Sequence, residues 1–183
     1  MKRCGWAKDD LMVQYHDCEW GIPLHDDQRL FEMLILEGAQ AGLSWSTILK
    51  RRQTYRKAFS NFDPLRVSKY TQKDVSRLLK DEGIIRNRLK IQSAINNAKQ
   101  FLAVQKEFGS FDEYIWGFVN GKPIKNNYKK SSDVPPSTDL SDKISWDLKK
   151  RGFSFVGSTI CYAFMQAVGI TDDHTSGCLG YKK

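Results

Sequence analysis

The sequence has few cysteines, no long apolar run and no strand-like alternation, and each absence excludes a class of protein. No stretch of the 183 residues approaches the roughly 20 apolar residues of a membrane-spanning helix, which excludes an integral membrane protein. The first residues, Met1 to Trp6, include Lys and Arg and show no apolar signal region. We therefore expect a cytoplasmic protein with no membrane partner.

Only four cysteines are present, and in the cytoplasm they are expected to be thiols or metal ligands rather than disulfides. No segment of useful length alternates apolar and polar residues as a half-buried strand does. No internal repeat is visible either. The sequence therefore predicts an all-α fold, in one domain over residues 1–183.

A series of helix start signals supports this fold class. These signals are Asp9 or Asp10, Asp26-Asp27, Ser44, Asp63-Pro64, Thr71 to Asp74, Ser110, Asp139 or Ser141, and Ser158. A long helix is expected from about Asn87 to Phe108. Residues 122–138 are polar and contain two adjacent prolines, so we expect a connection without secondary structure there. One short β-like piece is expected over residues 153–156.

One helical segment, from Met33 to Leu43, is apolar or small on nearly every face, which is typical of a buried helix. Glu37 lies in its middle, and an ionised carboxylate in a dry core is costly unless it is paired. No Arg or Lys occurs between Leu30 and Leu49. Glu37 therefore either meets a distant cation or points into a cleft that binds a ligand. The alternative is a carboxylate that caps a neighbouring helix end.

Features around this carboxylate suit a binding site. Gly38 and Gly42 are spaced by four residues, which lets another surface approach closely. A wedge at Leu43-Ser44 follows. Aromatic residues close to the proposed site are Trp6, Tyr15, Trp20 and Trp45. Such side chains stack on bases and cations, although aromatic residues more often belong to a core.

The formal net charge of +8 favours a polyanion as partner. The basic clusters are Lys50 to Arg52, Arg86 to Lys90, Lys125 to Lys130 and Lys149 to Arg151. Any one cluster is compatible with an ordinary solvated surface. Four clusters with aromatic residues between them favour nucleic acid.

A short turn framed by Gly152 and Gly157 separates the last two predicted helices. Free amides at the start of the second helix, near Ser158, can bind phosphate without side chains. Lys150 and Arg151 lie just before the turn. We predict a helix–hairpin–helix element over about residues 141–168, in which these residues contact a DNA backbone. Such contacts position a protein on DNA but do not read its sequence.

Cysteine and histidine residues near both ends of the chain suggest a metal site, because zinc prefers these ligands. The candidates are Cys4, His16, His174 and Cys178. One metal ion would then join segments that are far apart in the chain. The alternative is four unrelated residues, and Cys18 or Cys161 could replace one of the two cysteines.

Many of these residues belong to longer motifs that resemble those of one family. The motifs are Cys4-Gly5-Trp6, Tyr15-His16-Asp17, Glu19-Trp20-Gly21, Leu36-Glu37-Gly38, Gln40 to Trp45, Gly83 to Arg86, Lys150 to Phe153, Phe155-Val156-Gly157, Ile160-Cys161-Tyr162, Phe164 to Ala167, and Asp173-His174. They extend over nearly the whole chain, and the sequence resembles the 3-methyladenine DNA glycosylase I family. One difference is that Leu179 follows Cys178, where the family has a cysteine-rich end.

The resemblance implies a helix–hairpin–helix DNA glycosylase fold, with two helical lobes around a cleft and the termini joined by one structural zinc ion. It assigns the zinc ligands to the four cysteine and histidine residues named above. It makes Glu37 the partner of the adenine edge, with Tyr15 beside it and Trp45 stacked on the base. Among the residues of the chain, Glu37 is then the leading candidate for the catalytic general base. Trp6 and Trp20 would line the pocket. Gly42-Leu43-Ser44 would be the wedge that enters the DNA.

The implied activity is that of a monomeric DNA repair enzyme acting on double-stranded DNA with alkylated adenine. It would flip out 3-methyladenine and hydrolyse its N-glycosidic bond. No lysine occurs in the pocket motifs, so no lyase step is expected. Asp172 and Asp173 lie where related glycosylases carry a catalytic Asp, but Asp173 adjoins a predicted zinc ligand and is expected to turn away from the pocket. The rival hypothesis is a zinc-stapled DNA-binding module without catalysis, which leaves Glu37 unexplained.

Overall fold

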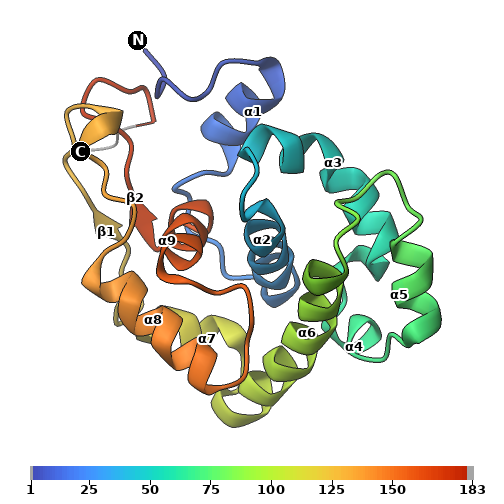
Figure 1. Ribbon diagram of the computed structural model, residues 1–183. Coiled ribbons are helices and arrows are strands. Elements are labelled where there is room, and N and C mark those ends of the chain that lie inside the picture. Colours follow the sequence, from blue (N-terminus) through green and yellow to red (C-terminus); the bar gives the residue numbers. More distant parts are fainter. Residues whose placement is uncertain (1, 181–183) are drawn as a thin grey trace.

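The computed structural model describes residues 2–180, in which helices gather around a central helix, α2 (Figure 1). Met1 and residues 181–183 of the predicted domain lie outside the described residues. The α-helices are α1 (Asp10–Cys18), α2 (Asp27–Gln40), α3 (Trp45–Ala58), α4 (Pro64–Val67), α5 (Gln72–Leu78), α6 (Arg88–Phe108), α7 (Phe111–Gly117), α8 (Asp139–Lys150) and α9 (Ser158–Ala167). The prediction of a mostly helical protein is confirmed. None of the described helices is both long and apolar enough to cross a membrane.

Two groups of helices share α2 as their common element. It packs against α3 and α6 on one side and against α7 and α9 on the other. In Figure 1, α3 to α6 form one half of the molecule and α7 to α9 form the other. Residues on α2 are therefore placed where the two groups meet.

Most of the predicted helix starts are confirmed by side-chain caps. The carboxylate of Asp26 accepts a hydrogen bond from the Arg29 amide at the start of α2. Ser44 caps α3 in the same way, and Thr71 with Asp74 forms a capping box at α5. These side chains satisfy amides that have no partner within the first turn of a helix.

The predictions for the last third of the chain need three corrections. Ser158 is the first residue of α9, and Gly157 is its N-cap. No strand forms over residues 153–156. Residues 122–138 instead contain the 3-10 helix η2 (Ser131–Asp133) and the strand β1 (Ile124–Lys125), which pairs in parallel with β2 (Thr171–Asp172). Sequence patterns missed this pair because each strand has two residues and its partner is distant in the chain.

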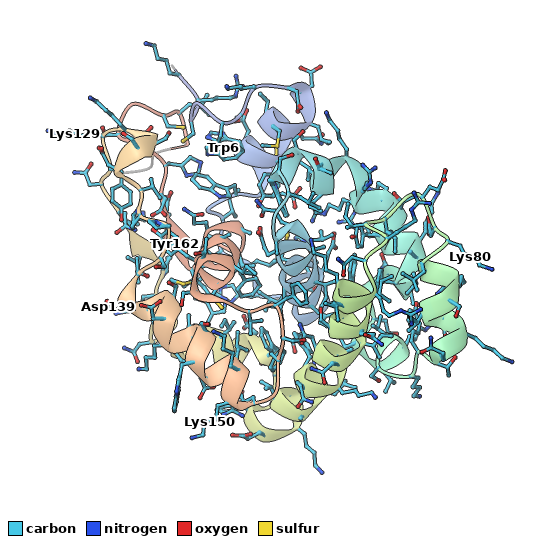
Figure 2. The ribbon with its side chains drawn as sticks, in the orientation of Figure 1. Trp6, Lys80, Lys129, Asp139, Lys150 and Tyr162 are labelled. Atoms are coloured by element: carbon cyan, nitrogen blue, oxygen red, sulfur yellow. The ribbon has the colours of Figure 1, made fainter. Side chains whose placement is uncertain are left out.

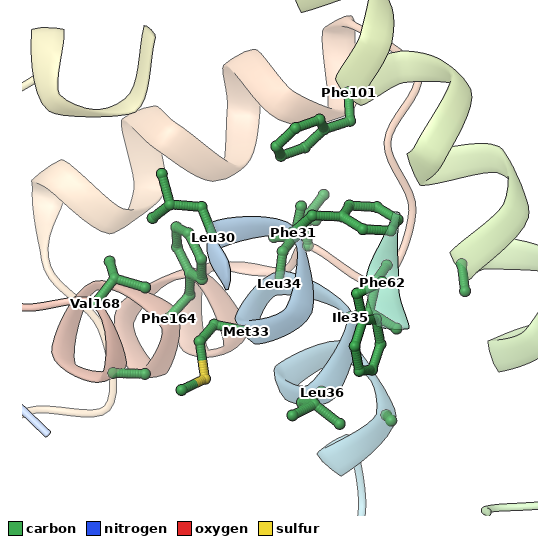
Figure 3. Close-up of a cluster of buried hydrophobic side chains, with 14 of the residues drawn as sticks. Leu30, Phe31, Met33, Leu34, Ile35, Leu36, Phe62, Phe101, Phe164 and Val168 are labelled. Atoms are coloured by element: carbon green, nitrogen blue, oxygen red, sulfur yellow. The ribbon is translucent and has the colours of Figure 1, made fainter. Parts of the chain in front are cut away.

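The core surrounds α2, as its apolar sequence predicts (Figure 3). Every residue from Leu30 to Ala39 is buried. Phe62, Phe101 and Phe164 from other parts of the chain pack around this helix. Burying each such side chain contributes about 1.5–3 kcal/mol to folding. A polar group on α2 is therefore costly unless it has a partner or a function.

Candidate active site and metal cluster

A cavity of about 270 Å³ opens beside α2. It is lined by Cys4, Trp6, Met12, Tyr15, Trp20, Glu37, Gln40, Trp45, Ser131, Val134, Ala163, Gln166 and Asp173. The lining combines α1, α2, α3 and α9 with the segments around Cys4 and η2. This volume is at the small end of ligand pockets, which suits a single base better than a whole nucleotide.

The carboxyl group of Glu37 lies in the cavity wall without a cationic partner among residues 2–180. The residue is 4% exposed, and its Oε2 has no hydrogen-bond partner. Glu32 on the same helix is equally buried but forms ion pairs with Arg52 and Arg56 of α3. Burial of a carboxylate is thus compensated at Glu32 and uncompensated at Glu37. Of the alternatives drawn from the sequence for Glu37, the structure favours the cleft.

Burial raises the pKa of Glu37 from its usual 4.5 to about 8. The physical cause is loss of water around the charged form, with no cation or hydrogen bond to replace it. At neutral pH the side chain is therefore mainly a neutral carboxylic acid. A cationic ligand in the cavity would favour the carboxylate and lower this pKa. A buried acid with so large a shift, facing a cavity, is a candidate functional group.

The predicted aromatic residues all meet at this cavity. The rings of Trp6 and Trp20 contact edge to face with centroids 5.0 Å apart, and Tyr15 lies 5.2 Å from Trp45. Burial, then the nearby carboxyl group of Glu37, raises the pKa of Tyr15 well above its usual value. Its phenol therefore stays protonated and can donate a hydrogen bond. The indole Nε1 of Trp45 is buried without a hydrogen-bond acceptor among the described residues.

Asp173 also lines the cavity, which corrects the expectation that it turns away. Both of its oxygens already accept hydrogen bonds. The donors are the Tyr162 hydroxyl, Gln166 Nε2, Asn126 Nδ2 and the Thr171 hydroxyl, at 2.6 to 3.2 Å. Asp173 is therefore a structural acceptor that joins α9, β2 and the segment after β1.

The two glycines near Glu37 serve different purposes. A Cβ atom added at Gly38 would lie 3.3 Å from Cβ of Phe155, so the glycine allows the turn between α8 and α9 to approach α2 closely. Gly42 has φ +77° and no neighbour within 4 Å of an added Cβ. Close approach is confirmed at Gly38 and wrong at Gly42, which instead permits a left-handed turn. That turn leaves Leu43 40% exposed beside the cavity.

The turn between α8 and α9 is held from behind by side chains of three helices. Asn96 and Asn97 of α6 donate to the carbonyls of Gly152 and Ser154. Ser145 of α8 and Cys161 of α9 both donate to the carbonyl of Val156. The roles of these two asparagines could not be predicted from sequence patterns, because their partners lie far along the chain. This arrangement fixes the turn and the N-terminus of α9 without covering Gly157, beside which an added Cβ would meet open space.

The two basic residues before this turn differ in their environment. The guanidinium of Arg151 pairs with Asp147 and Glu107 and lies over the rings of Phe108 and Tyr114. Lys150 is the last residue of α8 (Figure 2). Its ammonium instead lies over the exposed ring of Trp146. Lys150 is the one of the two whose charge is not already paired within the described residues.

Three of the four predicted metal ligands meet in a buried cluster. Cys4, His16 and Cys178 each offer one ligand atom, and these atoms lie within 4.8 Å of one another. The ring of His174 lies edge-on to that of His16, with centroids 4.8 Å apart, but it is not part of this cluster. Cys18 is exposed, so it does not replace either cysteine.

The surroundings of both histidines fit a metal site. Asp17 bonds Nδ1 of His16 at 2.8 Å, and Asp172 bonds Nδ1 of His174 at 2.7 Å. Metal-bound histidines are usually oriented in this way, with the other nitrogen left for the metal. Nε2 of His174 is buried and has no hydrogen-bond partner. Two buried thiols and two such imidazoles form a donor set that suits zinc.

The metal cluster and the cavity share a wall. Cys4 lines the cavity, and the ring of Trp20 lies 4.7 Å from that of His174. Trp6 contacts the ring of His16 at 5.2 Å. A metal ion in the cluster would therefore stabilise two of the indoles that shape the cavity.

Comparisons with known proteins agree with this site. A family model described as methyladenine glycosylase matches residues 6–181. DNA-3-methyladenine glycosylase 1 of Escherichia coli (strain K12) is 50% identical over 182 residues, which cover 99% of this chain and 97% of that protein. The DNA-3-methyladenine glycosylase of Haemophilus influenzae is 48% identical and covers 96% of each chain.

Solved structures show the same similarity in three dimensions. A crystal structure of 3-methyladenine DNA glycosylase I has a TM-score of 0.96 at 49% identity and covers 99% of this chain and 100% of its own. A structure of the Staphylococcus aureus enzyme, described in terms of 3-methyladenine recognition, has a TM-score of 0.96 at 38% identity, with 100% and 98% covered. On sequence, fold and coverage together, the chain belongs to the methyladenine glycosylase family.

Proposed function

We propose that the protein flips 3-methyladenine out of alkylated double-stranded DNA and hydrolyses its N-glycosidic bond, leaving an abasic site. Membership in the methyladenine glycosylase family supports this activity. The observation that carries the proposal is the unpaired carboxyl group of Glu37 in an aromatic cavity of single-base size. A DNA-binding module without catalysis has no use for such a group.

Charge distinguishes the damaged base from normal adenine. Methylation at N3 makes the base in DNA cationic and weakens its glycosidic bond. The electron-rich rings of Trp45, Trp6 and Trp20 and a carboxyl group able to ionise favour a cation over a neutral base. Glu37 and the Tyr15 hydroxyl would meet the base edge, with Trp45 stacked on its face. The arriving positive charge would then lower the pKa of Glu37 and release its proton.

Hydrolysis needs a water molecule and a carboxylate near the sugar. The bond between C1′ and the base nitrogen breaks, and its electrons leave with the base as neutral 3-methyladenine. Water adds to C1′ and loses a proton, for which Glu37 is the acceptor. Asp173 is excluded from this role because its oxygens already accept four hydrogen bonds. No lysine lines the described cavity, so the enzyme is expected to lack lyase activity.

Two exposed elements would bind the DNA. Leu43, flanked by Gly42 and Ser44, would fill the space left by the flipped nucleotide. The helix–hairpin–helix element of α8 and α9 would bind a phosphate through the amides near Gly157 and Ser158, with Lys150 nearby. Gly152, with φ +89°, shapes the turn. Arg151 would stabilise the turn through its carboxylate partners rather than contact DNA.

One structural zinc ion would bind Cys4, His16, His174 and Cys178. It would act as a cross-link between segments at opposite ends of the chain. The residues of one chain suffice to line the cavity, so no second subunit is needed to complete it, and we propose that the enzyme works as a monomer.

The direct test is incubation of the purified protein with a duplex that contains 3-methyladenine, followed by chromatography of released bases. Free 3-methyladenine is expected, with DNA strands that break only after treatment with heat or alkali. E37Q should bind the duplex and release no base, whereas the control E82Q, at an exposed site, should match the wild type. Binding by the wild type without any released base would support the rival DNA-binding module. Strand cleavage without alkali would contradict the absence of a lyase step.

A further inference from the structure

Lys90, near the start of α6, contacts the C-terminal end of α2. Its ammonium donates hydrogen bonds of 2.7 Å to the carbonyl oxygens of both Ala39 and Ala41. The last carbonyls of a helix have no partner within it, and a cation there is favoured by the helix dipole. The last turn of α2 contains no basic residue of its own. Lys90 of α6 therefore supplies the positive charge that the C-terminal turn of α2 lacks.

The two carbonyls that Lys90 binds lie between the cavity and the exposed loop that follows α2. Between them is Gln40, which lines the cavity, and Glu37 lies one turn earlier on α2. Directly after them come Gly42 and the exposed Leu43, whose amide donates to the carbonyl of Gln40 at 2.6 Å. Lys90 thus fixes the backbone at the point where the buried cavity wall ends and the exposed loop begins.

The same helix also holds the turn between α8 and α9. Asn97 follows Lys90 by seven residues, or about 10 Å along α6, and makes two hydrogen bonds to the backbone of Ser154. Figure 1 shows α6 beside both α2 and the segment that joins α8 to α9. One helix, α6, therefore sets the distance between the loop of Gly42 to Ser44, called the Leu43 loop below, and the turn between α8 and α9.

We propose that Lys90 is a positioning residue that holds the Leu43 loop in the geometry needed to enter duplex DNA. The proposal rests on the function given above, in which Leu43 replaces the flipped base. Lys90 is absent from the cavity lining, so it acts through the loop and does not touch the base. Its ammonium is partly desolvated, and this burial lowers its pKa. Two short hydrogen bonds to backbone carbonyls compensate for that desolvation.

The test compares K90M with K99M, because Lys99 is an exposed lysine of the same helix. Three measurements separate the possible roles: single-turnover excision from duplex, excision from a single strand of the same sequence, and affinity for free 3-methyladenine. A single strand needs no wedge to extrude its base. K90M should slow duplex excision roughly tenfold or more, since small misplacements near a reacting centre cost this much. Single-strand excision and free-base affinity should stay within about twofold of the wild type.

K90R adds a second check, because a guanidinium can donate to both carbonyls and should restore most of the duplex rate. K99M also removes one positive charge, so it controls for weaker attraction to phosphate. Apart from that small effect, its excision rates on both substrates should match those of the wild type. Equal losses of K90M on duplex, single strand and free base would overturn the proposal, since Lys90 would then support the cavity itself. An unchanged duplex rate would overturn it as well. A wild-type protein that releases no base from either substrate would refute the proposed function instead.

Discussion

The side-chain amide of Asn97 forms two hydrogen bonds with the backbone of Ser154, which fixes the turn between α8 and α9 to α6. Its Nδ2 donates to the carbonyl oxygen at 2.8 Å, and its Oδ1 accepts from the amide at 2.9 Å. Asn97 is 2% exposed. A buried amide satisfied in this way specifies one orientation of this turn, because any shift would leave polar groups unpaired.

Replacing Asn97 with alanine should therefore destabilise the protein by about 2 kcal/mol or more, since two backbone groups lose buried partners. It should also weaken binding to undamaged duplex DNA. The matched control is N96A, which removes a single hydrogen bond from an exposed site to the carbonyl of Gly152. Urea unfolding and DNA titrations measure both effects. Equal unfolding midpoints for the two variants would contradict the role assigned to Asn97.

The stability of the wild type should fall as pH rises through the range in which Glu37 titrates. Its pKa is about 8 in the folded protein and near 4.5 when unfolded, so between these values the folded state carries an extra proton. The contribution of Glu37 to the free energy of unfolding then falls by up to about 1.4 kcal/mol per pH unit. E37Q should remove this slope and be the more stable protein at pH 8. Parallel stability curves for the two proteins between pH 5 and 8 would disprove it.

The pH dependence of excision should report the same group. If the carboxylate of Glu37 is the active form, kcat/KM should rise with pH to a midpoint near 8, because this ratio reflects the free enzyme. The cationic base lowers the pKa of the bound enzyme, so the midpoint for kcat should lie at lower pH. Rate profiles over pH 5 to 9 at low and saturating substrate measure both. Coincident midpoints would show that the bound base does not act on Glu37.

Removing the proposed zinc ion should loosen the two segments that carry its ligands, around Cys4 and Cys178. C4S or a strong chelator should lower the melting temperature and remove zinc found by elemental analysis. The control C18S changes an exposed cysteine outside the cluster and should keep both zinc and stability. Because Trp20 packs on His174, the indole fluorescence should change with metal loss in C4S. A protein that contains no zinc and melts identically in all forms would refute the metal site.

Local signals in the sequence predicted much of this molecule. Caps such as Asp26 and Ser44 act within one turn, and the apolar run of α2 needs burial wherever it packs. Glu37 could be recognised because no cation lies near it in sequence. The ion pairs of Glu32 could not be predicted, because its partners Arg52 and Arg56 lie on another helix.

Features that depend on distant segments could not be predicted in this way. Asn97 and Lys90 have ordinary positions on an amphipathic helix, and their partners lie 57 and about 50 residues away. The charge of Arg151 suggested a phosphate contact, but Glu107 binds its guanidinium from a different helix. In each case the packing of whole helices decides which polar groups meet.

The close approach of Gly38 to Phe155 has one further consequence. With no side chain at Gly38, the α2 backbone that carries Glu37 lies directly against Phe155 in the turn between α8 and α9. A methyl group added at residue 38 would press on Phe155 and move α2 and this turn slightly apart. A substitution at residue 38 would then change the affinity for undamaged DNA and the selectivity among bases at the same time. The two properties are therefore expected to be coupled at this position.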